Sequence, residues 1–223
     1  MNKWFKVRMK YYIAKVPILY SFTRRLYFSW RKIYGQYILK RAATKSPLKI
    51  VVGASGVFEQ GWTPTDIEYL SLLDSTNWKL FFKENSIDAI LSEHVWEHLT
   101  LDEGLIAAQH CFQYLKPNGY IRVAVPDGFH SNPVYIDHVK PYGNGPGADD
   151  HKILYDYKTL SNLFRQAGFE VELLEYFDEN KKFHYNNWSI DKGMINRSKQ
   201  FDKRNSDGNL NYTSIIIDAV KYI

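Results

Sequence analysis

The chain has 223 residues, 45% of them hydrophobic and 24% charged, and its formal net charge is +5. This length suffices for one α/β domain with a full core and an appendage, and the composition is ordinary for a globular protein. The single cysteine, Cys111, excludes a disulfide framework within the chain and fits a cytoplasmic protein. We expect it to be a small core residue.

The net charge conceals an asymmetry along the chain. Residues 1–49 contain 13 Lys and Arg and no Asp or Glu, which leaves 16 Lys and Arg against all 24 Asp and Glu in the remainder. A basic arm therefore precedes an acidic body. Only the arm could be attracted to nucleic acid, because the body would repel it.

The arm, residues 1–46, is rich in aromatic and basic side chains. The segment from Arg24 to Arg41 is predicted to be an amphipathic helix, and Pro17 is expected to separate it from a shorter helix. No uncharged run approaches the ~20 residues of a membrane span, and no signal peptide is recognisable. The apolar positions at helical spacing are Leu26, Trp30, Ile33, Tyr34, Tyr37 and Ile38.

Three interpretations of this apolar stripe stay open. It packs on the body or on a second subunit, or it contacts an anionic membrane surface. Membrane contact through residues 1–45 would place a cytoplasmic protein at the inner membrane face. The third interpretation, stacking on RNA, is disfavoured by the acidic body.

The body, residues 47–223, is predicted to be one domain with an insert at 178–211 before its last strand. Strands alternate with helices through residues 48–177, which indicates a parallel sheet covered on both faces. The expected segments are strands at 48–52, 62–67, 87–91, 120–125, 170–177 and 212–221, helices at 78–83, 102–115 and 158–167, and a long loop at 126–150.

Glycine, acidic or imidazole residues follow four successive predicted strands. Because ligands of open parallel sheets bind outside the carboxyl ends of the strands, we expect these groups to converge on one site. Glycines let a ligand approach the backbone, and a carboxylate after the second strand can accept hydrogen bonds from both hydroxyls of a ribose. The four groups are Gly53-Ala54-Ser55-Gly56, Asp66, Ser92-Glu93-His94 and Pro126-Asp127-Gly128.

The order of these motifs resembles that of class I S-adenosylmethionine (SAM)-dependent methyltransferases, in the branch whose fourth strand runs into a Glu-His-Leu turn. The likeness covers about residues 48–177 and the last strand, and not the arm. In the usual Gly-x-Gly-x-Gly motif, Ser55 replaces the middle glycine and Val57 the last. The matching pieces are residues 51–56, Asp66, residues 88–99 ending in Glu97-His98-Leu99, residues 115–120, residues 125–127 and residues 160–169.

The resemblance implies a Rossmann-like α/β fold with a mostly parallel seven-stranded sheet, helices on both faces, an antiparallel last strand and an N-terminal helical arm. It also implies SAM as the cofactor. The implied cofactor-binding residues are Gly53, Ala54, Ser55 and Gly56 along the methionine part, Asp66 and Ile67 at the ribose, Leu73 and Asp74 near the adenine, and Ser92, Glu93 and His94 at the methyl-transfer face.

Methyl transfer requires the acceptor to be aligned with the sulfonium, and an oxygen or nitrogen acceptor can also need a general base. His94 is the best placed candidate in the sequence, and Asp127 and His151 are the other predicted catalytic residues. His130 is a further candidate base. Asp149-Asp150 can alternatively be a helix N-cap, with His151 in the first helical turn.

The histidine spacing raises the question of a metal site. His94 and His98 are four residues apart, and His110 follows on the next predicted helix. Glu97 stands in the wrong place for an H-E-x-x-H zinc motif, so no metal site is expected. Glu97 and His98 can instead orient the turn and satisfy buried backbone groups.

The insert has two open interpretations. Its aromatic and basic residues either form an acceptor pocket or seal the core; they are Phe183, His184, Tyr185, Trp188 and Arg197.

Together these observations predict a SAM-dependent methyltransferase that acts on a small-molecule or glycan acceptor. The alternative is a non-catalytic SAM-fold module that docks on a membrane or a protein partner. A third class is a nucleotide-sugar or NAD enzyme on a related fold.

Overall fold

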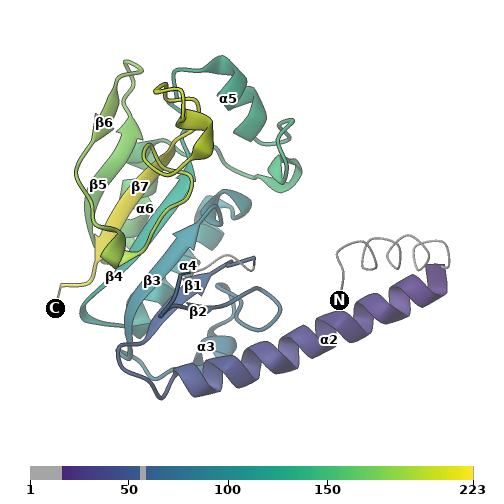
Figure 1. Cartoon of the computed structure of the whole chain (residues 1–223). Coiled ribbons are helices and arrows are strands. Elements are labelled where there is room, and N and C mark those ends of the chain that lie inside the picture. The colour runs from purple at the N-terminus through teal and green to yellow at the C-terminus, as the bar shows by residue number, and fades with distance from the viewer. Residues whose placement is uncertain (1–16, 56–58, 223) are drawn as a thin grey trace.

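A seven-stranded mixed sheet forms the body of this computed structural model, which describes residues 17–55 and 59–222 (Figure 1). The strand order is β2-β1-β3-β4-β7-β5-β6. β1 to β5 run in one direction, and β6 and β7 run against them, so the expected antiparallel last strand is confirmed. The strands are β1 (Lys49–Val52), β2 (Thr63–Pro64), β3 (Ile87–Glu93), β4 (Leu115–Pro126), β5 (Glu170–Phe177), β6 (Phe183–Tyr185) and β7 (Ser214–Val220).

The central strands are apolar on both faces because both faces are covered. Alternate residues point to opposite sides, so Ile50 and Val52 of β1 join the larger core cluster while Val51 joins a smaller one. In β7, Ile215 and Ile217 belong to the larger cluster in the same way. This alternation fixes the register in which β1, β3, β4 and β7 pair.

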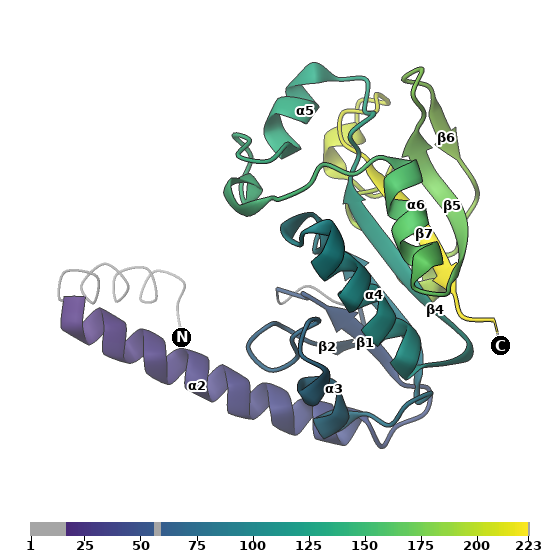
Figure 2. The same cartoon turned by 180° about the vertical axis from the view of Figure 1, so that it is seen from behind.

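Helices cover one face of the sheet, and the larger core cluster lies between them and the strands. Figure 2 shows α3 (Ser75–Phe81), α4 (Leu101–Tyr114) and α6 (Tyr157–Gln166) lying side by side on that face. α4 begins with a capping box, in which Thr100 and Glu103 each accept a hydrogen bond from the other's backbone N–H. Cys111 of α4 is fully buried, as expected for a core residue.

The insert covers the opposite face, where helices were also expected. Its helical pieces among the described residues are single 3-10 turns, Ile190–Lys192 and Lys203–Asn205. Trp188 and Ile195 of the insert instead pack on the smaller core cluster. The sheet is therefore closed on this side by irregular chain, which needs side-chain anchors to satisfy its backbone groups.

Two buried charged residues of the sheet supply these anchors. Arg122 of β4 forms a two-pronged ion pair with Asp218 of β7 and donates to the carbonyl oxygens of Ser189 and Gly193 at 2.8 and 2.6 Å. Glu175 of β5 accepts hydrogen bonds from the Lys199 backbone N–H and from the indole of Trp188 in the same insert. Both sheet residues are fully buried.

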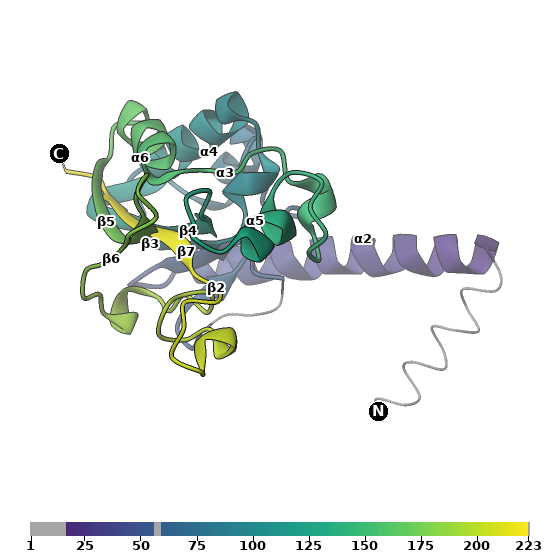
Figure 3. The same cartoon turned by 90° about the horizontal axis from the view of Figure 1, so that it is seen from above.

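The described part of the arm forms a long helix, α2 (Pro17–Ala42), which projects from the body (Figures 1 and 3). Only its C-terminal part is packed: Leu39 and Ala42 lie in the core, and Gly35 leaves room for the ring of Tyr69. The shorter helix expected before Pro17 lies outside the described residues.

The apolar stripe of α2 faces away from the body. Its five exposed residues fall within roughly a 100° arc of the helix, opposite Gly35 and Ala42, and Ile38 at the edge of the stripe is partly buried. Packing of this stripe on the body is therefore wrong, and the other interpretations stay predictions. In the part of the chain that the structure describes, no helix is long and apolar enough to cross a membrane. The exposed members of the stripe are Leu26, Trp30, Ile33, Tyr34 and Tyr37.

The segment expected to be one long loop, residues 126–150, contains two helical pieces. These are α5 (Pro133–Val139) and a 3-10 turn at Ala148–Asp150. α5 begins at Asn132, whose side chain accepts a hydrogen bond from the backbone of Val134, and Pro133 occupies the first helical position. The helix holds this segment over the carboxyl edge of the sheet (Figure 1).

Candidate active site

A cavity of about 690 Å³ lies at the carboxyl ends of β1 and β3. β1 is flanked by β2 on one side and by β3 on the other, so the order of the sheet reverses at this point. Such a reversal opens a crevice in which ligands of α/β proteins bind. The walls are the turn after β1, the end of β3, the segment 138–151 and the insert.

The turn after β1 lies on the cavity wall, as predicted. Gly53 has a φ of 63°, and a Cβ added there would lie 2.5 Å from Cγ2 of Val95. Ala54 and Ser55 also line the cavity, and Ser55 has a left-handed φ of 45°. Gly56 lies outside the described residues. This turn therefore exposes main chain at a position where a side chain would not fit.

The residues predicted for the ribose and adenine do not line the cavity. Asp66 accepts hydrogen bonds from the Arg31 guanidinium at 2.7 Å and from the Ile67 backbone N–H at 3.0 Å. The Ile67 side chain is exposed. Leu73 is also exposed, and Asp74 caps α3 by accepting from the backbone of residue 76. Their predicted cofactor contacts stay predictions.

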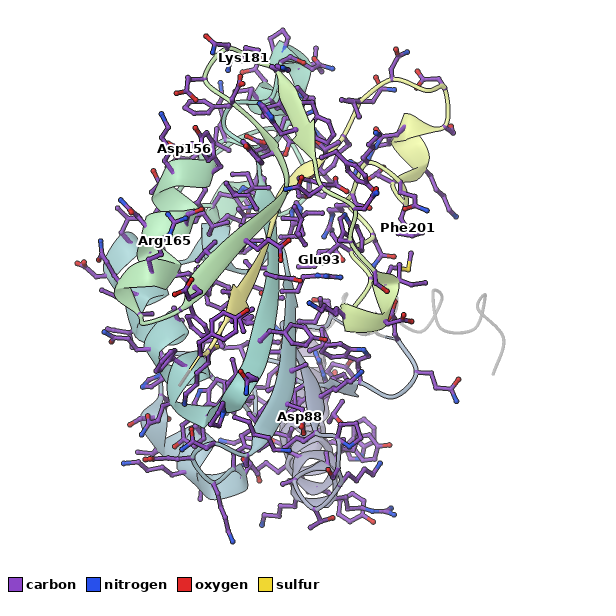
Figure 4. All side chains as sticks on the ribbon, turned by 90° about the vertical axis from the view of Figure 1, so that its left-hand side faces the viewer. Asp88, Glu93, Asp156, Arg165, Lys181 and Phe201 are labelled. Carbon is purple, nitrogen blue, oxygen red and sulfur yellow. The ribbon has the colours of Figure 1, made fainter. Side chains whose placement is uncertain are left out.

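The end of β3 divides its three predicted residues between different environments. Ser92 is fully buried, and within the described chain its hydroxyl has no hydrogen-bond partner. Glu93 lines the cavity and accepts from the backbone N–H groups of Asn196 and Arg197 at 3.1 and 2.8 Å. Figure 4 shows Glu93 between the sheet and the insert that carries Phe201. Glu93 is thus a third anchor of the insert.

His94 stands at the centre of the cavity wall. Its backbone is left-handed, with a φ of 56°, and this conformation turns the chain sharply after β3. Its Nε2 lies 3.0 Å from the Ser214 hydroxyl, and its Nδ1 lies 3.1 Å from Oε1 of Glu97. The ring stacks near Tyr212. These partners fix the imidazole while leaving it in contact with the cavity.

His151 also lines the cavity, beside Glu97 and His98. Its Nδ1 lies 2.7 Å from the carbonyl oxygen of Val139, so Nδ1 must carry the proton because a carbonyl only accepts. The Nδ1 of His98 lies 2.7 Å from Oδ1 of Asp150. The interpretation of Asp149-Asp150 as the N-cap of the next helix is wrong, because that helix is capped by a later residue.

That cap is Asp156, whose carboxylate accepts from the backbone N–H of Thr159 at 2.8 Å. α6 begins at Tyr157, seven residues after Asp150, so His151 is not in its first turn. Residues 151–156 form no helix, and His151 lies in this segment on the wall of the cavity.

The two remaining candidate bases are buried away from the cavity. Asp127 accepts from the backbone N–H groups of Phe129 and Phe177 at 2.9 and 2.7 Å, and burial raises its pKa to about 6. His130 stacks on Tyr135 with ring centroids 4.0 Å apart, and burial lowers its pKa to about 4. Their positions support structural roles, with Asp127 joining the ends of β4 and β5.

The insert covers the sheet and also reaches the cavity, and its role as an acceptor pocket stays a prediction. Trp188 seals the sheet, whereas Arg197 lines the cavity. Sequence reasoning missed Arg204 and Tyr212, which also line the cavity, with the guanidinium 3.3 Å from the ring centroid. Tyr212 was missed because it was expected to lie within a strand at 212–221. β7 begins only at Ser214, so Tyr212 precedes the strand and lies on the cavity wall.

Fold and site define the class: an α/β protein with a glycine turn and an imidazole at the carboxyl edge of its sheet. The family model described as "Methyltransferase domain" matches residues 40–174, and the chain belongs to this family. It is a SAM-dependent methyltransferase with a class I, Rossmann-like fold, and SAM is its cofactor.

Several solved structures are similar in fold. A SAM-dependent methyltransferase from Archaeoglobus fulgidus is 13% identical, with a TM-score of 0.45 over 88% of this chain and 93% of that one. One from Thermotoga maritima, described as a possible histamine N-methyltransferase, is 13% identical, with a TM-score of 0.46 over 88% and 95%. One from Mesorhizobium loti is 11% identical, with a TM-score of 0.46 over 83% and 97%. A comparison with curated protein sequences finds no match.

Proposed function

We propose that the enzyme methylates a small-molecule or glycan acceptor held between His94 and the insert. The observation that carries this proposal is the single cavity that extends from the glycine turn, past His94, to Arg197 and Tyr212. A volume of about 690 Å³ is in the range of small-molecule sites, and its lining of imidazole, carboxylate and guanidinium groups suits a polar acceptor.

The residues at the β1 end fit the methionine part of SAM. Gly53, Ala54 and Ser55 line the cavity, and the Ala54 N–H already donates to the carbonyl of Thr65 at 3.0 Å, so a carboxylate would be received by the neighbouring amides of this turn. Arg31 donates to Oδ2 of Asp66, so ribose hydroxyls that donate to this oxygen would compete with the ion pair. When bound, SAM supplies a methyl group that its sulfonium has already made electrophilic, so the chain's own task is to align the acceptor.

His94 is the proposed proton acceptor for an oxygen or nitrogen nucleophile. Its Nε2 is within hydrogen-bond distance of the Ser214 hydroxyl, its Nδ1 lies near Glu97, and it borders the cavity. The proton leaves the acceptor for an imidazole nitrogen as the new bond to carbon forms. His151 is the second candidate, since its Nδ1 is engaged by Val139 and its other ring nitrogen can accept a proton.

A methyl-transfer screen tests the proposal. Cell extracts separated into metabolite and glycan fractions are incubated with methyl-labelled SAM, and the labelled product is identified. We expect wild type to label a component of one fraction. His94→Ala should lose at least about tenfold in turnover while retaining affinity for the demethylated cofactor. The control, His184→Ala, removes a histidine of β6 and should behave as wild type.

Label appearing only in protein or RNA fractions would contradict the proposed acceptor class. Cofactor binding without turnover in any fraction would favour the alternative, a non-catalytic SAM-fold module. Unchanged turnover of His94→Ala would exclude His94 as the base.

We also propose that α2 contacts an anionic membrane surface, as a peripheral protein at the cytoplasmic face. Support comes from the exposed stripe, which includes Trp30 and Ile33, on a helix whose segment of the chain contains no acidic residue. The test is sedimentation with phosphatidylcholine vesicles, with or without phosphatidylglycerol. The triple variant Trp30→Ser, Ile33→Ser, Tyr37→Ser should abolish co-sedimentation with the anionic vesicles.

The matched control is Val134→Ser, which removes an equally exposed apolar side chain from α5. It should leave vesicle binding unchanged. If instead wild type ignores vesicles and the triple variant converts a dimer into a monomer, the stripe binds a second copy and the membrane proposal is wrong.

A further inference from the structure

A carboxylate and two imidazoles meet on the wall of the cavity. One ligand atom each of Glu97, His98 and His151 lies within 4.8 Å of the other two. Glu97 and His151 are buried, and His98 is partly exposed. His151 comes from a segment more than 50 positions along the chain, so the grouping is a product of the fold rather than of a local turn.

The environment of Glu97 points to a missing partner. The residue is fully buried, and within the described chain neither carboxylate oxygen accepts a well-aligned hydrogen bond. The Nδ1 of His94 lies 3.1 Å from Oε1, but in a geometry too bent for a good hydrogen bond. A buried carboxylate with so little compensation is costly unless a cation balances its charge.

The His151 imidazole is oriented as metal-binding histidines usually are. Its Nδ1 donates to the carbonyl of Val139 at 2.7 Å. A ligating histidine typically donates its other ring N–H to a backbone carbonyl or to a carboxylate, which fixes the tautomer. The nitrogen left available on His151 is therefore Nε2. The Nδ1 of His98 lies 2.7 Å from the carboxylate of Asp150, but within the described chain this buried nitrogen makes no well-aligned hydrogen bond, so His98, like Glu97, lacks a partner.

We propose that Glu97, His98 and His151 bind a divalent first-row transition-metal ion. Two neutral imidazoles and one carboxylate are the donor set of zinc sites and of other first-row metal sites with open coordination positions. Tetrahedral ligands about 2.1 Å from Zn²⁺ lie roughly 3.4 Å apart, so ligand atoms that lie up to 4.8 Å apart must approach by up to about 1.4 Å. The cavity then supplies an oxygen or nitrogen atom of the acceptor to the open positions.

These three ligands differ from the histidines His94, His98 and His110, which were considered from their spacing in the sequence. His94 and His98 do not act as a pair here, because His94 is turned to Ser214 and Glu97. His110 lies elsewhere, with its Nδ1 2.7 Å from the carbonyl of Leu72. The ligand that completes the group, His151, could not be found from spacing.

Zn²⁺ binding to the full chain, without an affinity tag and freed of metal by a chelator, tests the proposal. We expect one Zn²⁺ per chain in competition with a chromophoric chelator, and visible absorption bands of a low-coordinate site when Co²⁺ is added instead. His151→Ala and Glu97→Gln should each weaken Zn²⁺ binding at least tenfold. Glu97→Gln removes a buried, poorly compensated charge, so it should not unfold the protein.

The matched control is His184→Ala. This histidine also pairs with a carboxylate, Asp178 at 2.7 Å, but among the described residues no third ligand stands beside it. The control should bind Zn²⁺ as wild type does. Wild type that binds no Zn²⁺, or variants at 97 and 151 that bind it unchanged, would overturn the proposal and leave His94 to balance Glu97.

The position of the ion beside the acceptor rests on the proposed function, but Zn²⁺ binding does not. Affinity for the demethylated cofactor, measured on the same samples, separates the two. A chain that binds Zn²⁺ but methylates nothing upholds the metal site and overturns only the acceptor assignment.

Discussion

Arg31 of the arm helix donates to Asp66 at 2.7 Å, and Asp66 is the residue that the sequence predicts to hold the ribose of SAM. The same guanidinium donates to Glu68 at 2.9 Å. The arm is thus tied to the body through the end of β2, and cofactor binding at Asp66 would compete with this ion pair.

Replacing Arg31 should therefore raise cofactor affinity. In Arg31→Ala, Asp66 is free to accept from the ribose, and we expect up to about fivefold tighter binding, because a partly exposed ion pair contributes about 1 kcal/mol or less. Asp66→Ala should weaken binding. Titration calorimetry with the demethylated cofactor measures both. Lys32→Ala, the control, removes a neighbouring charge; equal affinities in all four proteins would show that Asp66 does not bind the ribose.

The glycine turn makes a second prediction. Gly53→Ala should lower the free energy of unfolding by about 1–3 kcal/mol and weaken cofactor binding, because the added methyl group meets Val95 in a left-handed backbone. Gly61→Ala is the matched control, since its φ is 88° and nothing lies within 4 Å of the added Cβ. In urea unfolding, both variants should lose stability through backbone strain, and Gly53→Ala should lose more. Titration with the demethylated cofactor should show weaker binding only for Gly53→Ala.

The ion pair of Arg122 with Asp218 should be essential for the insert. Arg122→Met removes the guanidinium that donates to the buried Asp218 carboxylate and to the carbonyls of Ser189 and Gly193, and we expect the free energy of unfolding to fall by about 3–5 kcal/mol. Arg122→Lys should not restore it, because an ammonium cannot reproduce the planar, forked geometry. Lys116→Met, which breaks a partly exposed ion pair to Asp88, should cost under about 1 kcal/mol in the same urea unfolding.

His130 should make the protein less stable in acid. Its pKa is lowered to about 4 by burial and by the charge of Lys181, so the unfolded chain takes up a proton more readily. The stabilising contribution is present above about pH 6.5 and lost as the pH falls toward 4. Between pH 7 and 5, the unfolding free energy of His130→Phe should therefore fall by about 1–2 kcal/mol less than that of wild type.

Asp127 provides a test of opposite sign. Burial raises its pKa to about 6, so its contribution is present below about pH 4 and lost as the pH rises through 6. Asp127→Asn should therefore lose more stability than wild type between pH 7 and 5. Parallel pH profiles of the three proteins would contradict both assignments.

Most elements of the fold could be predicted because their signals are local. The apolar run before Gly53 defines β1, and Thr100 with Glu103 defines the start of α4. Coverage of the second face could not be predicted, because it depends on how irregular chain is anchored. Arg122 and Glu175 lie within apolar strands, where a charged residue does not indicate its partner in sequence.

The site was predictable where it follows the ends of strands. Gly53 to Ser55, Glu93 and His94 were expected there, and the cavity brings them together. Asp66 was placed correctly after β2, but its ion pair with the arm required the fold. The place of Arg204 in the cavity and the grouping of Glu97 with His151 depend on contacts between distant segments of the chain. No periodic pattern in the sequence reveals such contacts.

The three sheet residues that anchor the insert bind it mainly through hydrogen bonds to its main chain. Glu93 and Glu175 accept from backbone N–H groups, and Arg122 donates to backbone carbonyls. Every amino acid except proline offers both of these atoms, so most side chains of the insert can vary without weakening its attachment to the sheet. The part of the cavity lined by the insert can therefore change its surface by substitution, while the turn after β1 keeps its shape.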